Sequence, residues 1–207
     1  MTDIRAVVFD IGNVLLNWQP EAFYDRMIGA EARKHLFSQV DLDGMNLSID
    51  AGAPFRATVQ ATAAAHPQWS GPILWWHDRW GQMATPAIDH SVRLLRALRR
   101  QGVPVFALSN FGIDSFALAQ RLYPFLTEFD RLCISGHLGF LKPDPRIYAA
   151  VEGDCGLPPD TLLFTDDKPA NIDAAVARGW HGHLFTGPQG LADRLVAYGL
   201  LQREDAA

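Results

Sequence analysis

The stretch RAVVFDIGNV, residues 5–14, decides the fold that this sequence predicts. Its apolar run, Arg5–Ile11, is short and rich in β-branched and aromatic residues, and Gly12 and Asn13 follow it, which is typical of a buried strand. Asp10 stands near the end of this run, where burial of a carboxylate is costly unless it has a partner or a chemical task. The stretch therefore predicts a first strand that carries a polar group at its carboxyl end.

Four more apolar runs have the same character, and helical patterns lie between the later ones. We predict strands at Val103–Ser109, Arg131–Ser135, Thr161–Thr165 and His183–Phe185, and helices at Ile88–Arg100, Pro145–Glu152, Ala170–Ala177 and Leu191–Tyr198. Strands that alternate with helices indicate a parallel sheet covered by helices on both faces. The sequence therefore predicts an α/β protein with a Rossmann-like parallel sheet core.

The region 18–84 has a different pattern, because it contains no convincing strand and reads as several helices. Alanine- and threonine-rich segments and four tryptophans, Trp69, Trp75, Trp76 and Trp80, fill it. An all-helical stretch of this length is too long for an ordinary crossover between adjacent strands. We therefore expect a helical domain at 18–84, inserted into a core formed by 1–17 and 85–207.

Composition limits the classes of partner. The chain has 207 residues and a formal net charge of −5, so a nucleic acid or an anionic membrane surface is not the expected partner. The two cysteines, Cys133 and Cys155, form no CxxC pair, and the sequence shows neither a signal-peptide pattern nor a run apolar enough to span a membrane. We expect a soluble cytoplasmic protein. The sequence does not indicate its oligomeric state.

Polar residues follow the later predicted strands, and ligands of open α/β sheets bind outside the carboxyl ends of the strands. Ser109 and the backbone N–H of Asn110 could bind an anion at a strand-to-helix turn. Lys142 precedes a helix and could neutralise a phosphate. Asp166 and Asp167 are adjacent carboxylates whose repulsion a divalent cation such as Mg²⁺ would remove. Each motif alone also suits an ordinary turn or helix cap.

The order of these groups along the chain resembles the four motifs of the haloacid dehalogenase superfamily. The strings FDIGNVL, LSN, GFLKPDPRIY and FTDDKPANIDAA match those motifs and span nearly the whole chain outside the helical region. The helical region itself lies where that family places its cap, between the first two motifs. The resemblance implies a magnesium-dependent hydrolase that acts on a small phosphorylated metabolite.

The resemblance also implies roles for individual residues. Asp10 would attack phosphorus and form an aspartyl-phosphate. The metal would be held by Asp10, the backbone carbonyl of Gly12, and either Asp166 or Asp167, a choice that the sequence leaves open.

The remaining site residues would bind the substrate. Ser109 and the N–H of Asn110 would hold a phosphoryl oxygen, and Lys142 would contact both the phosphoryl group and the Asp10 carboxylate. Trp18, eight residues after Asp10, is well placed to face the substrate.

One departure from the family pattern bears on the chemistry. Many phosphatases of the superfamily carry a second aspartate two residues after the nucleophile, as general acid and base, and here that position is Gly12. The leaving group must then be protonated by water, by the substrate or by another side chain, and His137 is the first side chain to test. We also expect that a glycine stands here because its φ is positive.

Two alternatives remain beside phosphate hydrolysis. Haloacid dehalogenases also lack this second aspartate, so Asp10 could attack carbon and displace halide without a metal. The chain could also be a non-catalytic binding protein that kept the fold. The Asp166–Asp167 pair, combined with Asp-x-Gly-Asn at the first strand, resembles instead the glucose-1-phosphate phosphatase subgroup. We therefore favour a phosphatase, with a sugar phosphate among the candidate substrates.

Overall fold

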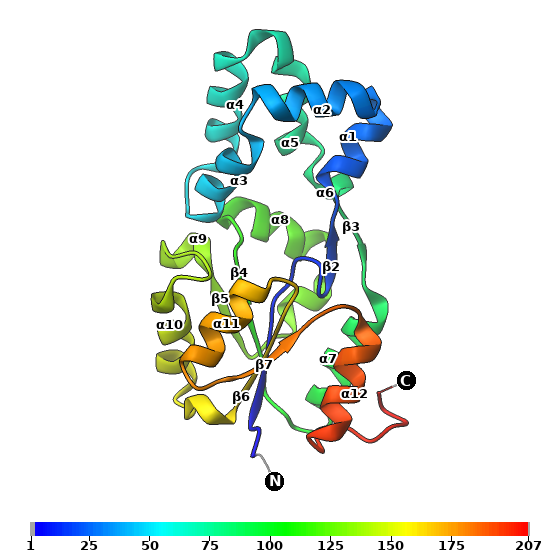
Figure 1. Cartoon of the computed structure of the whole chain (residues 1–207), viewed down its shortest axis with the longest axis vertical. Coiled ribbons are helices and arrows are strands. Elements are labelled where there is room, and N and C mark those ends of the chain that lie inside the picture. The colour runs from blue at the N-terminus through cyan, green and yellow to red at the C-terminus, as the bar shows by residue number, and fades with distance from the viewer. Residues whose placement is uncertain (1–2, 207) are drawn as a thin grey trace.

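A five-stranded parallel sheet forms the centre of the protein in the computed structural model, which describes residues 3–206 (Figure 1). The strands are β1 (Ala6–Phe9), β4 (Val105–Ser109), β5 (Arg131–Ile134), β6 (Leu162–Asp166) and β7 (His181–Leu184), in the order β5-β4-β1-β6-β7. Every neighbouring pair is parallel. The predicted α/β class is confirmed, and the strand order reverses beside β1, where such sheets bind ligands.

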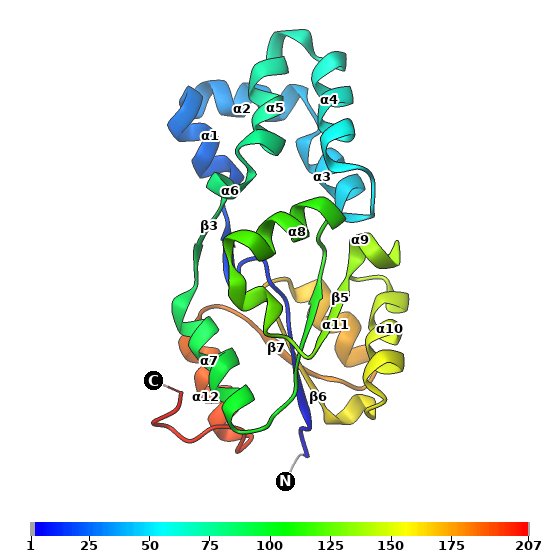
Figure 2. The same ribbon diagram turned by 180° about the vertical axis from the view of Figure 1, so that it is seen from behind.

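Alternate residues of the central strand enter two separate hydrophobic clusters. Val7 and Phe9 belong to the cluster that includes residues of α7 (Asp89–Arg100), α8 (Ile113–Leu122) and α12 (Pro188–Ala197). Ala6 and Val8 belong to the cluster that includes residues of α10 (Pro145–Cys155) and α11 (Pro169–Ala177). Figure 2 shows α7 and α8 on the side of the sheet opposite to α11. Both faces are therefore covered, which explains why the strands are apolar throughout rather than alternating.

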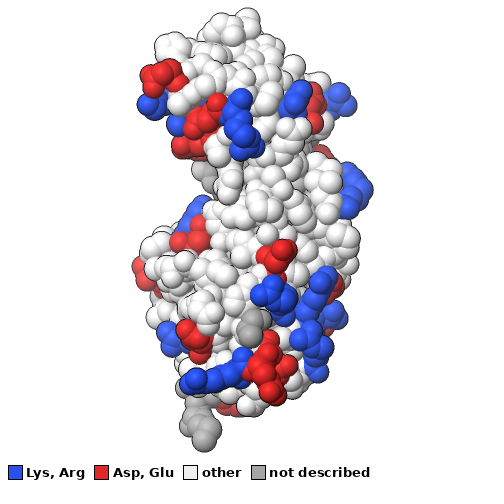
Figure 3. All heavy atoms as spheres, turned by 90° about the vertical axis from the view of Figure 1, so that its right-hand side faces the viewer, with Lys and Arg blue, Asp and Glu red and all other residues white. Residues whose placement is uncertain are grey.

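Residues 20–83 form a helical unit at the end of the molecule far from both termini (Figure 1). Its helices are α1 (Pro20–Ile28), α2 (Ala30–Gln39), α3 (Leu42–Asp50), α4 (Phe55–Ala65), α5 (Ser70–Asp78) and α6 (Trp80–Met83), with a 3₁₀ turn at Pro67–Trp69. Trp76 and Tyr24 are buried between them. Figure 3 shows a narrow waist between this unit and the sheet domain.

An antiparallel pair of short strands joins the helical unit to the sheet domain. These strands are β2 (Leu16–Trp18) and β3 (Ala84–Ala87). The expectation that 18–84 holds no strand is therefore wrong at its two ends. Because β2 and β3 are short and far apart in sequence, neither carries a local signal of the pairing.

Smaller elements complete the described chain. The sequence analysis did not predict α8, and β7 begins at His181 and ends at Leu184 rather than running from His183 to Phe185. Short turns of helix lie at Pro124–Thr127, Ser135–Leu138 (α9) and Pro159–Thr161. Among residues 3–206, no helix combines the length and the apolar character that crossing a membrane requires.

Candidate active site

Sheet register brings the four polar motifs to one edge. Phe9 pairs with Ala107 in β4 and with Thr165 in β6, so the residues that follow these positions leave the sheet together. Asp10 comes directly after β1, and Asp166 is the last residue of β6. The site is thus built by strand pairing between segments about 100 and 150 residues apart in the chain.

The Lys142 ammonium lies between two buried carboxylates. Its Nζ is 2.9 Å from Asp10 Oδ1 and 2.6 Å from Asp166 Oδ2. Asp10 Oδ1 also accepts hydrogen bonds from Ser109 Oγ and from the backbone N–H of Ile11, both at 2.7 Å. These three donors converge on Oδ1, so Oδ2 is the oxygen of Asp10 that is available to a ligand.

Burial and charge act in opposite directions on this cluster. Burial raises the pKa of Asp10 to about 6, the positive charge of Lys142 opposes that rise, and the negative charge of Asp166 adds to it. Burial alone would lower the pKa of Lys142, but the two carboxylates outweigh it and raise that pKa above its ordinary value. The lysine therefore stays charged, and the Asp10 carboxylate depends on it.

The two aspartates at the end of β6 differ in how fully their oxygens are used. Asp166 is fully buried, and beside Lys142 it accepts hydrogen bonds from Asn171 Nδ2 at 2.9 and 3.0 Å and from the backbone N–H of Lys168 at 2.8 Å. Asp167 is partly exposed and lines the pocket described below. Oxygens of Asp10, Asp166 and Asp167 lie within 4.8 Å of one another. Asp167 is the member of the pair with an oxygen free to bind a cation.

Asn13 is a site residue that the sequence analysis missed. It has a φ of 56°, a left-handed conformation that asparagine tolerates better than most residues. Its Oδ1 accepts the backbone N–H of Trp18 at 3.0 Å, and its Nδ2 donates to Asp167 Oδ2 at 3.1 Å. Asn13 thus holds the Asp167 carboxylate in place. The adjacent Gly-Asn pair was the signal for such a turn.

The expectation that Gly12 has a positive φ is wrong, since the left-handed residue of this loop is Asn13. A Cβ added to Gly12 would meet no atom within 4 Å. Position 12 therefore has room for a side chain, and neither backbone strain nor crowding explains the glycine.

Ser109 and Asn110, at the end of β4, form hydrogen bonds with other residues of the site. Ser109 is buried and directs its hydroxyl at Asp10. Asn110 forms a reciprocal pair with the backbone of Lys142, whose N–H donates to Asn110 Oδ1 at 2.7 Å and whose carbonyl accepts from Asn110 Nδ2 at 3.0 Å. The Asn110 side chain thereby holds the lysine loop against β4, a role that the sequence analysis did not foresee.

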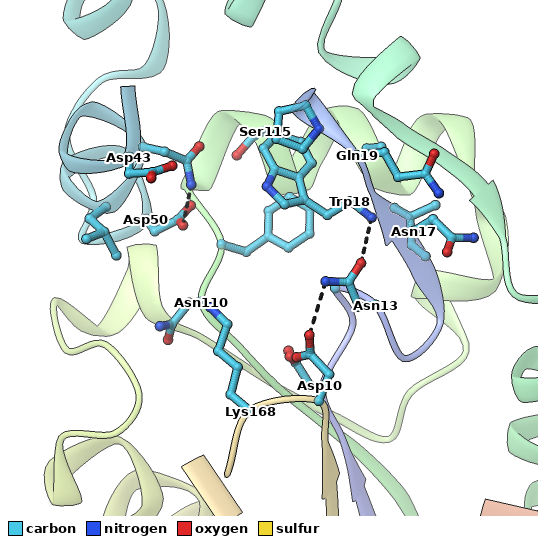
Figure 4. Close-up of a pocket in the computed structure, with 18 of the residues that line it drawn as sticks. Asp10, Asn13, Asn17, Trp18, Gln19, Asp43, Asp50, Asn110, Ser115 and Lys168 are labelled. Atoms are coloured by element: carbon cyan, nitrogen blue, oxygen red, sulfur yellow. Dashed lines mark hydrogen bonds between the residues drawn. The ribbon is translucent and has the colours of Figure 1, made fainter. Parts of the chain in front are cut away.

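A pocket of about 730 Å³ opens between this sheet edge and the helical unit (Figure 4). Its aromatic lining comes from Trp18, Trp76, Trp80 and Phe111, and Trp18 packs against Trp76 with ring centroids 5.7 Å apart. His137 is not one of the lining residues and instead borders a separate groove beside Ile113.

The polar lining of the pocket has two parts. Asp10, Asp167, Lys142 and Lys168 line it from the sheet domain. From β2 and the helical unit come three carboxylates and three side-chain amides. These belong to Glu21, Asp43 and Asp50, and to Asn17, Gln19 and Asn46.

A family model for haloacid dehalogenase-like hydrolases matches residues 4–179. The chain belongs to this family. Its membership agrees with the geometry, in which the four motifs of the family meet at one sheet edge. The resemblance stated from the sequence is therefore confirmed at the level of the superfamily, and the chain is a hydrolase by family.

Two curated relatives of this hydrolase carry phosphate-hydrolase names. Sesquiterpene phosphatase astK of Aspergillus oryzae is 27 % identical over 202 residues, which cover 87 % of this chain and 89 % of the relative. Flavin mononucleotide hydrolase 1 of Arabidopsis thaliana is 30 % identical over 115 residues, 55 % of this chain. The chain spans only 46 % of the length of that plant protein in the match.

Solved structures share the fold of this hydrolase. A HAD family enzyme of Bacteroides thetaiotaomicron, crystallised with magnesium and inorganic phosphate, aligns with a TM-score of 0.68 at 22 % identity, over 89 % of this chain and 95 % of that one. Dehalogenases are also among the structures with this fold. The fold alone therefore does not separate the two chemistries.

Proposed function

We propose that this hydrolase is a Mg²⁺-dependent phosphatase that cleaves a small phosphorylated metabolite through an aspartyl-phosphate on Asp10. The observation that carries the proposal is the cluster at the sheet edge. The Asp10 carboxylate is oriented by Lys142 and Ser109 and lies with the carboxylates of Asp166 and Asp167 inside 4.8 Å. A nucleophile, a cation beside it and hard oxygen donors are the groups that phosphoryl transfer requires.

The donor set fits magnesium. Mg²⁺ prefers oxygen ligands and binds proteins through one or two carboxylates, with the substrate supplying further oxygens. Asp10, Asp167 and the backbone carbonyl of Gly12 would hold the ion, with Asp166 behind them bound to Lys142. When bound, Mg²⁺ would neutralise charge on the phosphoryl oxygens and template the attack. The Bacteroides relative crystallised with magnesium and phosphate supports this choice of ion.

The protein's own residues position the reacting atoms. The hydrogen bonds to Asp10 Oδ1 fix the orientation of the carboxylate that attacks phosphorus. Lys142 offsets the repulsion between that carboxylate and the incoming phosphoryl group. The backbone N–H of Asn110 would hold a phosphoryl oxygen, and Ser109 would join it by turning its hydroxyl from Asp10 to that oxygen. The Asn110 side chain keeps the lysine loop in register.

The pocket favours a neutral, carbon-rich leaving group. The partly exposed ring of Trp18 suits stacking against apolar or C–H-rich faces. The carboxylates of the helical unit can accept hydrogen bonds from substrate hydroxyl groups, and its side-chain amides can both accept hydrogen bonds from them and donate to them. We therefore propose a sugar phosphate or a similar hydroxylated phosphate ester as the substrate class. The phosphatase and hydrolase names of the two relatives support a phosphate ester in general.

Dehalogenation of a 2-haloacid suits this pocket less well. Such a substrate carries its own carboxylate, which Glu21 and Asp43 would repel, and dehalogenation employs no metal ion to offset that repulsion. Lys142, the lysine in contact with Asp10, is already shared between two carboxylates. Halide release from 2-chloropropionate without metal is therefore expected to be undetectable, and robust release would favour the dehalogenase reading over ours.

The decisive experiment measures hydrolysis of 4-nitrophenyl phosphate with Mg²⁺ and with a chelator. We expect turnover only with the ion and none from Asp10→Asn, whose amide can still accept the bond from Ser109. Asp78→Asn removes an exposed carboxylate of the helical unit outside the pocket and should match the wild type. Full activity in the chelator, or an active Asp10→Asn protein, would contradict the mechanism. A wild type without activity on any phosphate ester would leave the non-catalytic alternative.

A further inference from the structure

The structure assigns the missing general acid and base to Asp50, a residue of the helical unit. This assignment rests on the proposed phosphatase function. Asp50 is the last residue of α3, lines the same pocket as Asp10, and lies across it from the nucleophile (Figure 4). Gly12, the family's usual position for this group, offers no side chain. A carboxyl group that faces the nucleophile from the opposite wall is placed to reach the leaving-group oxygen and the water that follows it.

A hydrogen-bond chain fixes the orientation of the Asp50 carboxyl. The Trp76 indole N–H can only donate, and it donates to Asn46 Oδ1 at 3.1 Å. The Asn46 amide is therefore turned so that its Nδ2 donates to Asp50 Oδ2 at 2.8 Å. This bond and one from the backbone N–H of Gly112 fix the direction in which the Asp50 carboxyl group faces.

Asp50 is also anchored to the sheet domain, although it belongs to the helical unit. Its backbone carbonyl accepts the Ser135 hydroxyl at 2.6 Å. Next to it the two units approach so closely that a Cβ on Gly52 would lie 2.8 Å from the carbonyl oxygen of Gly136. The position of Asp50 relative to the strand ends is thus set by direct contact between the two units.

The electrostatic setting suits a group that must both give and take a proton. Burial raises the pKa of Asp50 to about 7, and the charge of Asp10 adds to this effect. The backbone N–H of Gly112 and the charge of Lys168 oppose it. The Asp43 carboxylate also faces this pocket. Both protonation states are populated near neutral pH, which is the condition for efficient general acid–base catalysis.

Asp50 gives up a proton in the first step and regains one in the second. In the first step the Asp10 carboxylate bonds to phosphorus, the ester P–O bond breaks, and the Asp50 proton passes to the departing oxygen. In the second step a water oxygen bonds to phosphorus, the bond from phosphorus to Asp10 breaks, and the water proton passes to the Asp50 carboxylate. The enzyme returns to its starting protonation state.

The test compares two leaving groups in rapid-quench experiments on the Mg²⁺-loaded protein. Asp50→Asn is isosteric and can still accept the Asn46 bond, so its fold should persist, and thermal unfolding checks this. With 4-nitrophenyl phosphate, whose leaving group needs no proton, the variant should give a burst of product at the wild-type rate. A slow steady state should follow, because water lacks its base. With an alkyl phosphate the burst rate itself should fall by about 10²- to 10⁴-fold.

Two outcomes would overturn the assignment. In one, Asp50→Asn slows the burst equally with both leaving groups, which identifies a residue that only positions the substrate. In the other, the variant behaves like the wild type with both. The control Asp78→Asn should leave both phases unchanged. If the wild type hydrolyses neither ester, the proposed phosphatase function has failed. If the wild type is active and Asp50→Asn gives one of these two outcomes, the phosphatase function stands and only the role of Asp50 is refuted.

Discussion

Replacing Lys142 by methionine tests the charge cluster most directly. The Lys142 side chain is 1 % exposed and lies between Asp10 and Asp166, whose side chains are 10 % and 0 % exposed. Methionine keeps the length of the side chain and removes the charge, which leaves two buried carboxylates facing one another. Breaking a buried ion pair by removing one partner costs about 3–5 kcal/mol. At roughly 2–4 °C per kcal/mol for a chain of this size, the melting temperature should fall by about 6–20 °C.

The pH dependence of this loss follows from the raised pKa of Asp10. Burial already raises that pKa to about 6 against the pull of Lys142, so removal of the lysine raises it further. When the pKa of a carboxyl group is higher in the folded than in the unfolded protein, the free energy of unfolding falls as the pH rises from about 4 through the folded pKa. The destabilisation of Lys142→Met should therefore be smaller near pH 5 than near pH 8.

Urea unfolding without metal, followed by tryptophan fluorescence at about pH 5 and pH 8, measures this difference. Lys142→Met combined with Asp166→Asn should recover part of the stability at the higher pH, because one of the two unpaired charges is gone. A loss below about 1 kcal/mol at the higher pH, or a loss that does not change with pH, would refute the reasoning.

Four other predictions concern single positions. Gly12→Asp should fold, and in an Asp50→Asn background it should raise alkyl phosphate turnover at least tenfold, as steady-state rates would show. Asn13→Gly keeps the backbone conformation but releases Asp167, so the half-activating Mg²⁺ concentration should rise by about 10- to 100-fold in a titration. The burst rate with an alkyl phosphate should fall above about pH 7 as Asp50 loses its proton, and this limb should be absent from Asp50→Asn. Trp18→Ala should raise KM by about tenfold or more with little change in the burst rate for 4-nitrophenyl phosphate.

Much of the sheet domain could be predicted from the sequence because its signals are local. A buried parallel strand is an unbroken apolar run, and the polar residue that ends it marks the ligand-binding edge. Asp10 and the Asp166–Asp167 pair are predicted from this signal, and Lys142 is predicted from the helix that begins after it. Family membership is confirmed, while the individual roles of these residues stay predictions until the variants are measured.

The choice between Asp166 and Asp167 depended on tertiary contacts. Both are aspartates in the same tetrapeptide, and only packing shows that Asn171 and Lys142 occupy the oxygens of Asp166. Asn13 was missed for the same reason, since its partner Asp167 is 154 residues away.

The sequence by itself determined the α/β class, the order of the motifs and the hydrolase family, because apolar runs and the residues that end them are read within a few positions. The tertiary structure alone brought Asp50 to the wall opposite Asp10. In the chain Asp50 is one carboxylate among many on helical segments. Its environment arises only when α3 packs against the loops after β4 and β5, where the surrounding protein removes water and Asn46 orients the carboxyl group.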